Sequence, residues 1–192
     1  MELNELAPGL RRWVAYYPEW KDDVGSLAVE TDDGLVLIDP LDPPRELGPA
    51  RHVLLTIFWH ARSTRDLGAG RIWAPARSLR PLERRGVDAH PVRPGDELPG
   101  GIQALASGRS GEVVYWLPAQ RALVAGDVLL GGPLRICPDS WIGKAGQAAV
   151  REALSPALEL PIELVLVSHG VPVLAGGRAA LRRALDQAPS AA

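Results

Sequence analysis

The sequence is poor in several features that mark whole classes of protein. It has one cysteine, Cys137, so no internal disulfide can form and an oxidising compartment gains no support. It has no stretch of about 18 uncharged apolar residues, which excludes a membrane-spanning helix. Residues 1–10 have neither the basic segment nor the apolar core of a signal peptide. Together these absences predict a cytoplasmic protein.

An excess of charge of one sign is also missing. The chain has 21 Lys and Arg against 23 Asp and Glu, for a net charge of −2. Nothing in this balance points to nucleic acid or to an anionic membrane as a partner. The arginines within residues 77–85 form a local basic run, which we interpret as a solvated surface.

The length and the spacing of turn residues indicate the kind of fold. The 192 residues suit one domain that spans residues 1–192, and only the tail 188–192 is expected to fray. The 20 glycines and 18 prolines fall between apolar runs and form no low-complexity tract. Many short elements joined by tight turns are therefore expected.

Apolar runs and turn signals predict two β-hairpins. Residues 25–40 contain two β-rich stretches around Asp33-Gly34, a strong type I′ turn signal. The second hairpin joins residues 112–117 to residues 121–125. The aromatic residues between positions 13 and 20 predict an edge strand packed on the first hairpin.

The remaining elements alternate between strands and helices. Three helices are expected: one that begins at Ser63, with Asp66 completing an approximate capping box, one over residues 145–158 and one over residues 178–188. Five further strands are expected, over residues 52–58, 71–74, 86–92, 102–106 and 162–167. This order favours two sheets covered by helices, an α/β fold of four-layer αββα type.

Four sequence segments, in order between residues 25 and 173, resemble the metallo-β-lactamase superfamily. The segment LVLIDP is similar to the family's opening strands, and LLTIFWHARS stands where the family has Thr-His-x-His-x-Asp-His. ASGRSGEVVYW followed by LVAGDVLLGG is similar to its glycine loop, hairpin and Gly-Asp. VLVSHGVPV is similar to its terminal strand and Gly-His-Gly loop. The resemblance implies a metallo-β-lactamase-like fold.

Most positions at which the family binds zinc hold other residues here. With Thr56 as the anchor, the family's histidines and aspartate fall on Ile57, Trp59, Ala61 and Arg62. The loop of the third histidine has no histidine, and Arg109 is the nearest residue. Asp127, at the bridging carboxylate position, and His169, at the last ligand position, remain. A zinc site needs three or four nitrogen, sulfur or carboxylate ligands, so this ligand count argues against a two-zinc hydrolase.

Two functional classes stay open from the sequence, and it does not decide whether the chain is an enzyme. In the first, the site is degenerate and metal-free, and Arg62 or Arg109 pairs with Asp127. The same arginines, with Asp139 at the mouth of the pocket, would bind a small anionic ligand such as a carboxylate or a phosphate. We expect no cofactor in this class.

The second class is an atypical hydrolase of ester, thioester or phosphoester substrates. His60 lies one position from the family's second histidine, and with Asp127 and His169 it makes a two-histidine, one-carboxylate set. Such a set would hold at most one divalent ion, zinc, manganese or iron, and the same three residues would be catalytic. For either class, the aromatic residues near the N-terminus suggest a homodimer, and we interpret Trp141 as a packing residue.

Overall fold

The computed structural model describes residues 2–68, 70–144 and 146–187. The tail 188–192, which we expected to fray, lies outside the described residues. Within these ranges no helix combines the length and the apolar character needed to cross a lipid bilayer.

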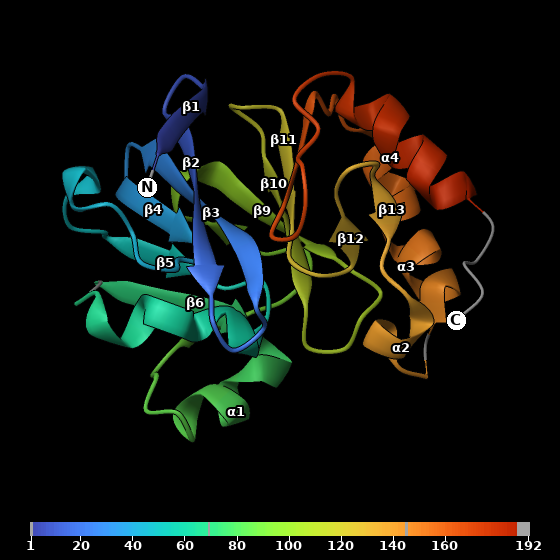
Figure 1. The fold of residues 1–192 in the computed structure, drawn as a ribbon. Coiled ribbons are helices and arrows are strands. Elements are labelled where there is room, and N and C mark those ends of the chain that lie inside the picture. The colour runs from blue at the N-terminus through green and yellow to red at the C-terminus, as the bar shows by residue number, and fades with distance from the viewer. Residues whose placement is uncertain (1, 69, 145, 188–192) are drawn as a thin grey trace.

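A first sheet of seven strands contains the N-terminal half of the chain (Figure 1). Its strands lie in sequence order: β1 (Leu3–Ala7), β2 (Leu10–Tyr17), β3 (Asp22–Thr31), β4 (Gly34–Ile38), β5 (His52–Leu54), β6 (Arg71–Pro75) and β7 (His90–Val92). The pairs from β1 to β4 are antiparallel, whereas those from β4 to β7 are parallel. The parallel strands therefore end at the same edge of the sheet.

A second sheet of five strands has the order β14-β11-β10-β9-β8. Its bounds are β8 (Glu97–Leu98), β9 (Ile102–Ala106), β10 (Val113–Leu117), β11 (Ala122–Ala125) and β14 (Leu164–Val167). The hairpin β10-β11 is antiparallel and β14 runs parallel to β11. A separate two-stranded sheet joins β12 (Leu129–Leu130) to β13 (Arg135–Ile136).

The helices cover the outer faces of the two large sheets. The α-helices are α1 (Leu79–Glu83), α2 (Asp139–Ile142), α3 (Gly146–Leu154) and α4 (Gly177–Asp186). The 3-10 segments are η1 (Arg45–Leu47), η2 (Phe58–Asp66), η3 (Ala76–Ser78), η4 (Pro99–Gly101) and η5 (Ser155–Glu159). In Figure 1, α1 lies on the side of β6, whereas α2, α3 and α4 lie on the side of β12 and β13.

Three apolar clusters fill the spaces between these layers. One lies between the two sheets, one lies between the first sheet and the segments η2 and α1, and one lies between the second sheet and the helices α3 and α4. Strand β10 contributes side chains to two of these clusters. Val114 and Trp116 face the helices while Val113, Tyr115 and Leu117 face the other sheet, so the strand is buried on both faces. The αββα arrangement predicted from the sequence is confirmed.

Some predicted boundaries were wrong. The first hairpin turns at Asp32-Asp33, because Thr31 pairs with Gly34, and the residue that takes positive φ is Gly34. Strand β2 is not an edge strand, because β1 pairs with its outer side. The strands expected over residues 52–58 and 86–92 shorten to β5 and β7.

The helix expected to begin at Ser63 was also placed wrongly. The 3-10 segment η2 already begins at Phe58, and no side chain caps it. The hydroxyl of Ser63 instead donates to the Asp42 carboxylate at 3.1 Å and accepts from the Asp42 backbone N–H. The capping pattern was therefore a coincidence of spacing.

The loop that carries Arg109 approaches α3 so closely that only glycine fits at position 108. Gly108 has φ +81°, and a Cβ there would lie 2.3 Å from the backbone oxygen of Ala149. We expect Gly108→Ala to lower the free energy of unfolding by about 2–3 kcal/mol, through this clash and the strained φ. Urea unfolding measures the change.

Gly143 supplies a matched control for this substitution. It has the same φ, +81°, but no atom of the residues that the structure describes lies within 4 Å of the place that a Cβ would occupy. Gly143→Ala should cost only the backbone strain, about 1 kcal/mol. Equal losses in the two variants would show that the close approach at Gly108 contributes nothing.

Candidate functional site

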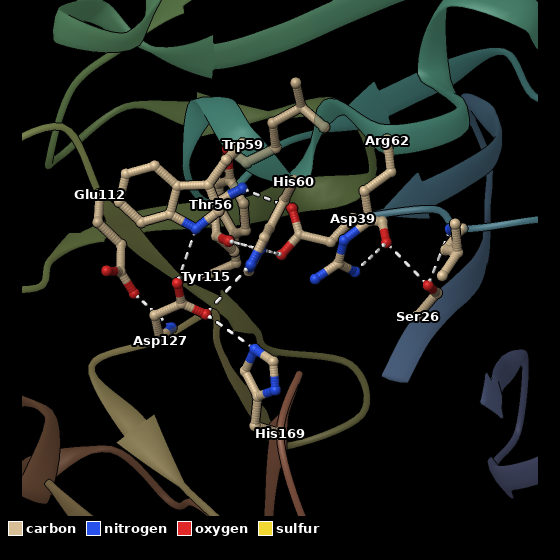
Figure 2. Close-up of polar contacts among 12 residues, drawn as sticks. Ser26, Asp39, Thr56, Trp59, His60, Arg62, Glu112, Tyr115, Asp127 and His169 are labelled. Carbon is tan, nitrogen blue, oxygen red and sulfur yellow. Dashed lines mark hydrogen bonds and ion pairs between the residues drawn. The ribbon is translucent and has the colours of Figure 1, made fainter. Parts of the chain in front are cut away.

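Polar side chains gather where strands of the two sheets end next to each other (Figure 2). Asp39 follows β4, and His60 follows β5 in the segment η2. Asp127 follows β11, and His169 follows the parallel strand β14. In layered α/β folds, binding sites are built at the carboxyl ends of parallel strands. The topology thus brings these four side chains to one place.

His60 is fully buried and is held by a carboxylate. Its Nδ1 lies 2.8 Å from Asp39 Oδ2, and the same carboxylate accepts hydrogen bonds from the backbone N–H and the hydroxyl of Thr56. Because Asp39 accepts from Nδ1–H, the neutral imidazole has its lone pair on Nε2. No hydrogen-bond partner for this Nε2 exists among the described residues.

His169 is held in the same way from a distant part of the chain. Its Nδ1 lies 2.9 Å from Asp22 Oδ2, at the start of β3. Trp20 stacks on its ring with centroids 5.6 Å apart. A backbone hydrogen bond from Gly25 to Ser168 fixes the loop against β3. Within the described part of the chain, His169 Nε2 is also buried without a hydrogen-bond partner.

Asp127 has one oxygen that is bonded and one that is not. Oδ2 accepts a hydrogen bond from Trp59 Nε1 at 2.8 Å and lies 3.6 Å from Arg109 Nη1. Oδ1 is buried and makes no hydrogen bond to any described residue. Glu112 fixes the backbone here, because its Oε1 accepts from the N–H groups of Asp127 and Val128.

The three atoms without partners point to one spot. His60 Nε2, Asp127 Oδ1 and His169 Nε2 all lie within 4.8 Å of one another. The carboxylate oxygen is 3.1 Å from His60 Nε2 and 3.6 Å from His169 Nε2. Ligand atoms of a tetrahedral zinc ion with bonds of about 2.0–2.1 Å are separated by roughly 3.3 Å. The described residues therefore fit one divalent ion.

Burial and neighbouring charges strongly shift the pKa values of the titratable groups in this cluster. Burial alone would lower the pKa of His60, but the carboxylates of Asp127 and Asp39 outweigh it and raise the pKa to about 9. Burial would raise the pKa of Asp127, yet the positive charge of His60 holds it well below its usual range. Burial, followed by the Asp127 charge, raises the pKa of Glu112 to about 7.

The other residues predicted for the site lie in different places. Arg109 forms ion pairs with Glu112 at 3.3 Å and with Asp127 at 3.6 Å. Arg62 has no carboxylate within 4.0 Å among the described residues, and its Nη1 donates to the backbone oxygen of Asp39 at 3.4 Å. Burial lowers the pKa of Arg62. Asp139 accepts a hydrogen bond from the backbone of Gln147 in α3 and is not part of the convergent group.

Sequence reasoning missed the carboxylates that hold the histidines. Asp39 ends the buried strand of LVLIDP, and a carboxylate at a strand end was a usable signal. Asp22 had none, because it lies 147 positions from His169. Glu112 was taken as the first residue of a strand, although its side chain is fully buried and fixes the Gly126-Asp127 turn.

A small cavity of about 210 Å³ opens beside Asp127. Trp20, Trp59 and Trp141 form most of its wall, together with Arg109. Trp141 is thus partly exposed at the cavity, not simply packed as expected. A larger hollow of about 1080 Å³ lies at the opposite ends of β4, β5 and β6, and none of the three convergent side chains lines it.

Solved structures with the same fold give this arrangement its context. The chain is similar to a metallo-β-lactamase family protein from Thermus thermophilus, with 18% identity over 93% of this chain and 79% of that one, and a TM-score of 0.68. It is also similar to TTHA1623 in a di-iron-bound form, with 23% identity over 90% and 98% of the chains and a TM-score of 0.65. A third is the metallo-β-lactamase FIM-1 from Pseudomonas aeruginosa in its mono-zinc form, with 14% identity over 97% and 96% and a TM-score of 0.66.

These likenesses show that the chain has the metallo-β-lactamase fold, which confirms the fold expected from its sequence. Neither a family model nor a curated protein sequence matches the chain.

Proposed function

We propose that the chain is a hydrolase that works with a single divalent metal ion held by His60, Asp127 and His169. One observation carries the proposal: three buried ligand atoms without hydrogen-bond partners converge within 4.8 Å. Without an ion, the two imidazole nitrogens face a single carboxylate oxygen, Asp127 Oδ1, which lies 3.1 Å from His60 Nε2 and 3.6 Å from His169 Nε2. A divalent cation is the partner that suits two imidazole nitrogens and one carboxylate oxygen.

The surroundings of the histidines support the same proposal. Each imidazole has its Nδ1 on a carboxylate, Asp39 for His60 and Asp22 for His169. Such carboxylate–histidine pairs are typical of metal sites, because they fix the ring orientation and make the other nitrogen a stronger ligand.

The number of ligands supports one ion and not two. Within the described ranges, one group of three histidine, cysteine or acidic side chains has the spacing of a metal site. Arg109, whose guanidinium lies 3.6 Å from Asp127 Oδ2, adds a fixed positive charge on the side of Asp127 opposite the ligand oxygen. A second dication next to this group would be strongly repelled.

The residues around the ion suggest how it would be used. A bound divalent ion supplies Lewis-acid activation of a carbonyl or phosphoryl group and of water. Trp59 and Arg109 hold Asp127 Oδ2, which leaves Oδ1 directed to the two Nε2 atoms and able to act as a metal ligand. The three tryptophans make an apolar wall that would accept a hydrophobic part of the substrate. Ester, thioester or phosphoester substrates with a small apolar group are therefore the class to test.

Metal analysis of the purified protein tests the proposal. We expect about one zinc, manganese or iron per chain, removed by a chelator and restored by addition of the metal. At roughly 100 times its dissociation constant, the metal should raise the free energy of unfolding by about 2.7 kcal/mol. Hydrolysis of chromogenic ester, thioester and phosphoester substrates should follow the metal content. A chain that binds no metal, with stability unchanged by chelator, would leave the metal-free ligand-binding alternative.

Metal uptake should also release a proton, because His60 must be neutral to bind. With its pKa raised to about 9, His60 is protonated in the metal-free chain at pH 7.5. We expect about one proton released per ion at this pH, and an affinity that rises about tenfold per pH unit until pH 9. A pH-indicator dye in weak buffer measures the release.

The raised pKa of His60 also predicts how the stability of the metal-free chain changes with pH. A raised pKa in the folded state gives stability that is complete below the ordinary value of 6.5 and is lost as the pH rises through about 9. The chelated protein should therefore become less stable between these pH values. A metal affinity that does not change from pH 7 to pH 9 would contradict the assigned role of His60.

A further inference from the structure

Three arginines line a second cavity on the other side of Trp59. This cavity has a volume of about 380 Å³, and its wall includes Arg62, Arg65 and Arg85 together with Tyr17 and Trp59. The tryptophan also lines the cavity beside Asp127, so the two cavities share a wall. The volume of the second cavity lies within the range of small-molecule sites.

The arginines come together from two segments of the chain. Arg62 and Arg65 belong to η2, and Arg85 follows α1. The Arg65 side chain lies against Gly86, since a Cβ there would be 3.8 Å from its Cζ. The guanidinium of Arg85 lies over the ring of Phe58, 5.0 Å from the ring centroid. Three cationic groups thus surround one hollow.

Positive charge in this cavity is poorly compensated. Among residues 2–68, 70–144 and 146–187, no carboxylate lies within 4.0 Å of any of the three guanidinium groups. Glu19 is the acidic residue of the wall, and it accepts a hydrogen bond from the Tyr17 hydroxyl. The lining of the hollow thus has three arginines and one carboxylate, while the charges of Asp39 and Asp127 act on Arg62 from outside this lining.

Arg62 differs from an ordinary surface arginine. Its Nε and Nη2 are out of contact with solvent and make no hydrogen bond to any described residue. The guanidinium lies 5.8 Å from the ring centroid of Tyr17 and 6.0 Å from that of Trp20. Its backbone has φ 31°, a conformation that costs about 1–3 kcal/mol for a residue other than glycine. The fold keeps this charge in the cavity wall where water does not solvate Nε or Nη2.

We infer that this cavity binds a phosphate group of a small-molecule ligand. A phosphate monoester has a charge near −2 at neutral pH and several acceptor oxygens, which match the excess of arginine over carboxylate in the lining. The exposed side chains of Arg65 and Arg85 make the direct contacts, and Arg62 adds its charge from the wall. The shared wall at Trp59 places the rest of the ligand toward the metal site. Only this last step rests on the proposed hydrolase function.

Inorganic phosphate is the probe for the cavity. In a nitrogen-15 NMR titration of the chelator-treated protein, phosphate should shift the signals of the Trp59 indole and of Gly86. Arg85→Met, at an exposed position that should not disturb folding, should weaken phosphate binding at least tenfold. The Arg62→Met variant should weaken it by a similar factor. Acetate, with a single charge, should bind more weakly than phosphate.

Arg84→Met provides the matched control, because Arg84 is exposed beside Arg85 but does not line the cavity. Arg84→Met should bind phosphate like the wild type. His169→Ala, which removes one of the proposed metal ligands, should also bind phosphate like the wild type. Phosphate binding that survives in Arg85→Met, or that falls equally in Arg84→Met, would overturn the inference. A wild-type chain that binds phosphate but no metal would reject the proposed hydrolase and support the phosphate site. A chain that binds metal but no phosphate would reject the phosphate site alone.

Discussion

An Asp127→Ala variant is expected to bind a divalent ion at least about 100-fold more weakly than the wild type. The carboxylate is the one negatively charged group among the three proposed ligands, and its Oδ1 lies between the two imidazole nitrogens. Loss of a residue that merely orients a ligand typically costs 10–100-fold in metal affinity. Loss of the ligand itself should cost more. Competition with a zinc-binding dye measures the affinity.

Asp88→Ala is the control for this substitution, because Asp88 is an exposed aspartate away from the site. It should leave the metal affinity unchanged. Asp127→Ala also removes the acceptor of the Trp59 indole and a partner of Arg109, so folding must be checked by circular dichroism. A well-folded Asp127→Ala variant with wild-type metal affinity would show that the ion binds elsewhere.

The second large effect is expected at Asp39. Its carboxylate accepts hydrogen bonds from the backbone and hydroxyl of Thr56 and from His60, all three of them buried. Asp39→Ala leaves these groups without their acceptor and removes the negative charge that His60 faces. Breaking a buried charge pair in this way costs about 3–5 kcal/mol, so we expect a loss of that size in the free energy of unfolding. Urea unfolding of the metal-free protein measures it.

Asp39→Asn separates the two roles of this side chain. The amide oxygen can still accept from the Thr56 backbone, so the loss of stability should be smaller, about 1–3 kcal/mol. Metal affinity should nevertheless fall by roughly 10–100-fold, because the neutral amide no longer orients His60 or raises its basicity. Equal metal affinity in Asp39→Asn and the wild type would contradict the orienting role, whatever the stability.

The fold was predictable because the apolar runs of this chain are local signals. The runs in LVLIDP, VVYWL, ALVA and LVLV each form a buried strand, and the Gly-Asp pair after ALVA and the Ser-His pair after LVLV marked strand ends correctly. Short elements were less predictable. The apolar run after His52 looked like one long strand, but tertiary contacts turn the chain into a 3-10 segment at Phe58.

The candidate site was only partly predictable, for a geometrical reason. The sequence offered His60, Asp127 and His169 as one set of ligands, and the structure brings these three side chains together. It could not show that Arg62 turns toward Tyr17 and Trp20, since that depends on a positive φ at a residue without any glycine signal. Nor could it pair Asp22 with His169, because contacts between distant segments leave no periodic pattern in a single sequence.

The hydrogen bond between Asp22 and His169 also bears on when the proposed metal site forms during folding. Asp22 is synthesised early, whereas its partner His169 is added only near the end of the chain. Closing a loop of this length is entropically costly, and it becomes favourable only after both sheets have formed and docked. The newly made chain should therefore be unable to capture metal until its C-terminal strand has been added, and a shortened chain that stops before β14 should stay metal-free even with His60 and Asp127 in place.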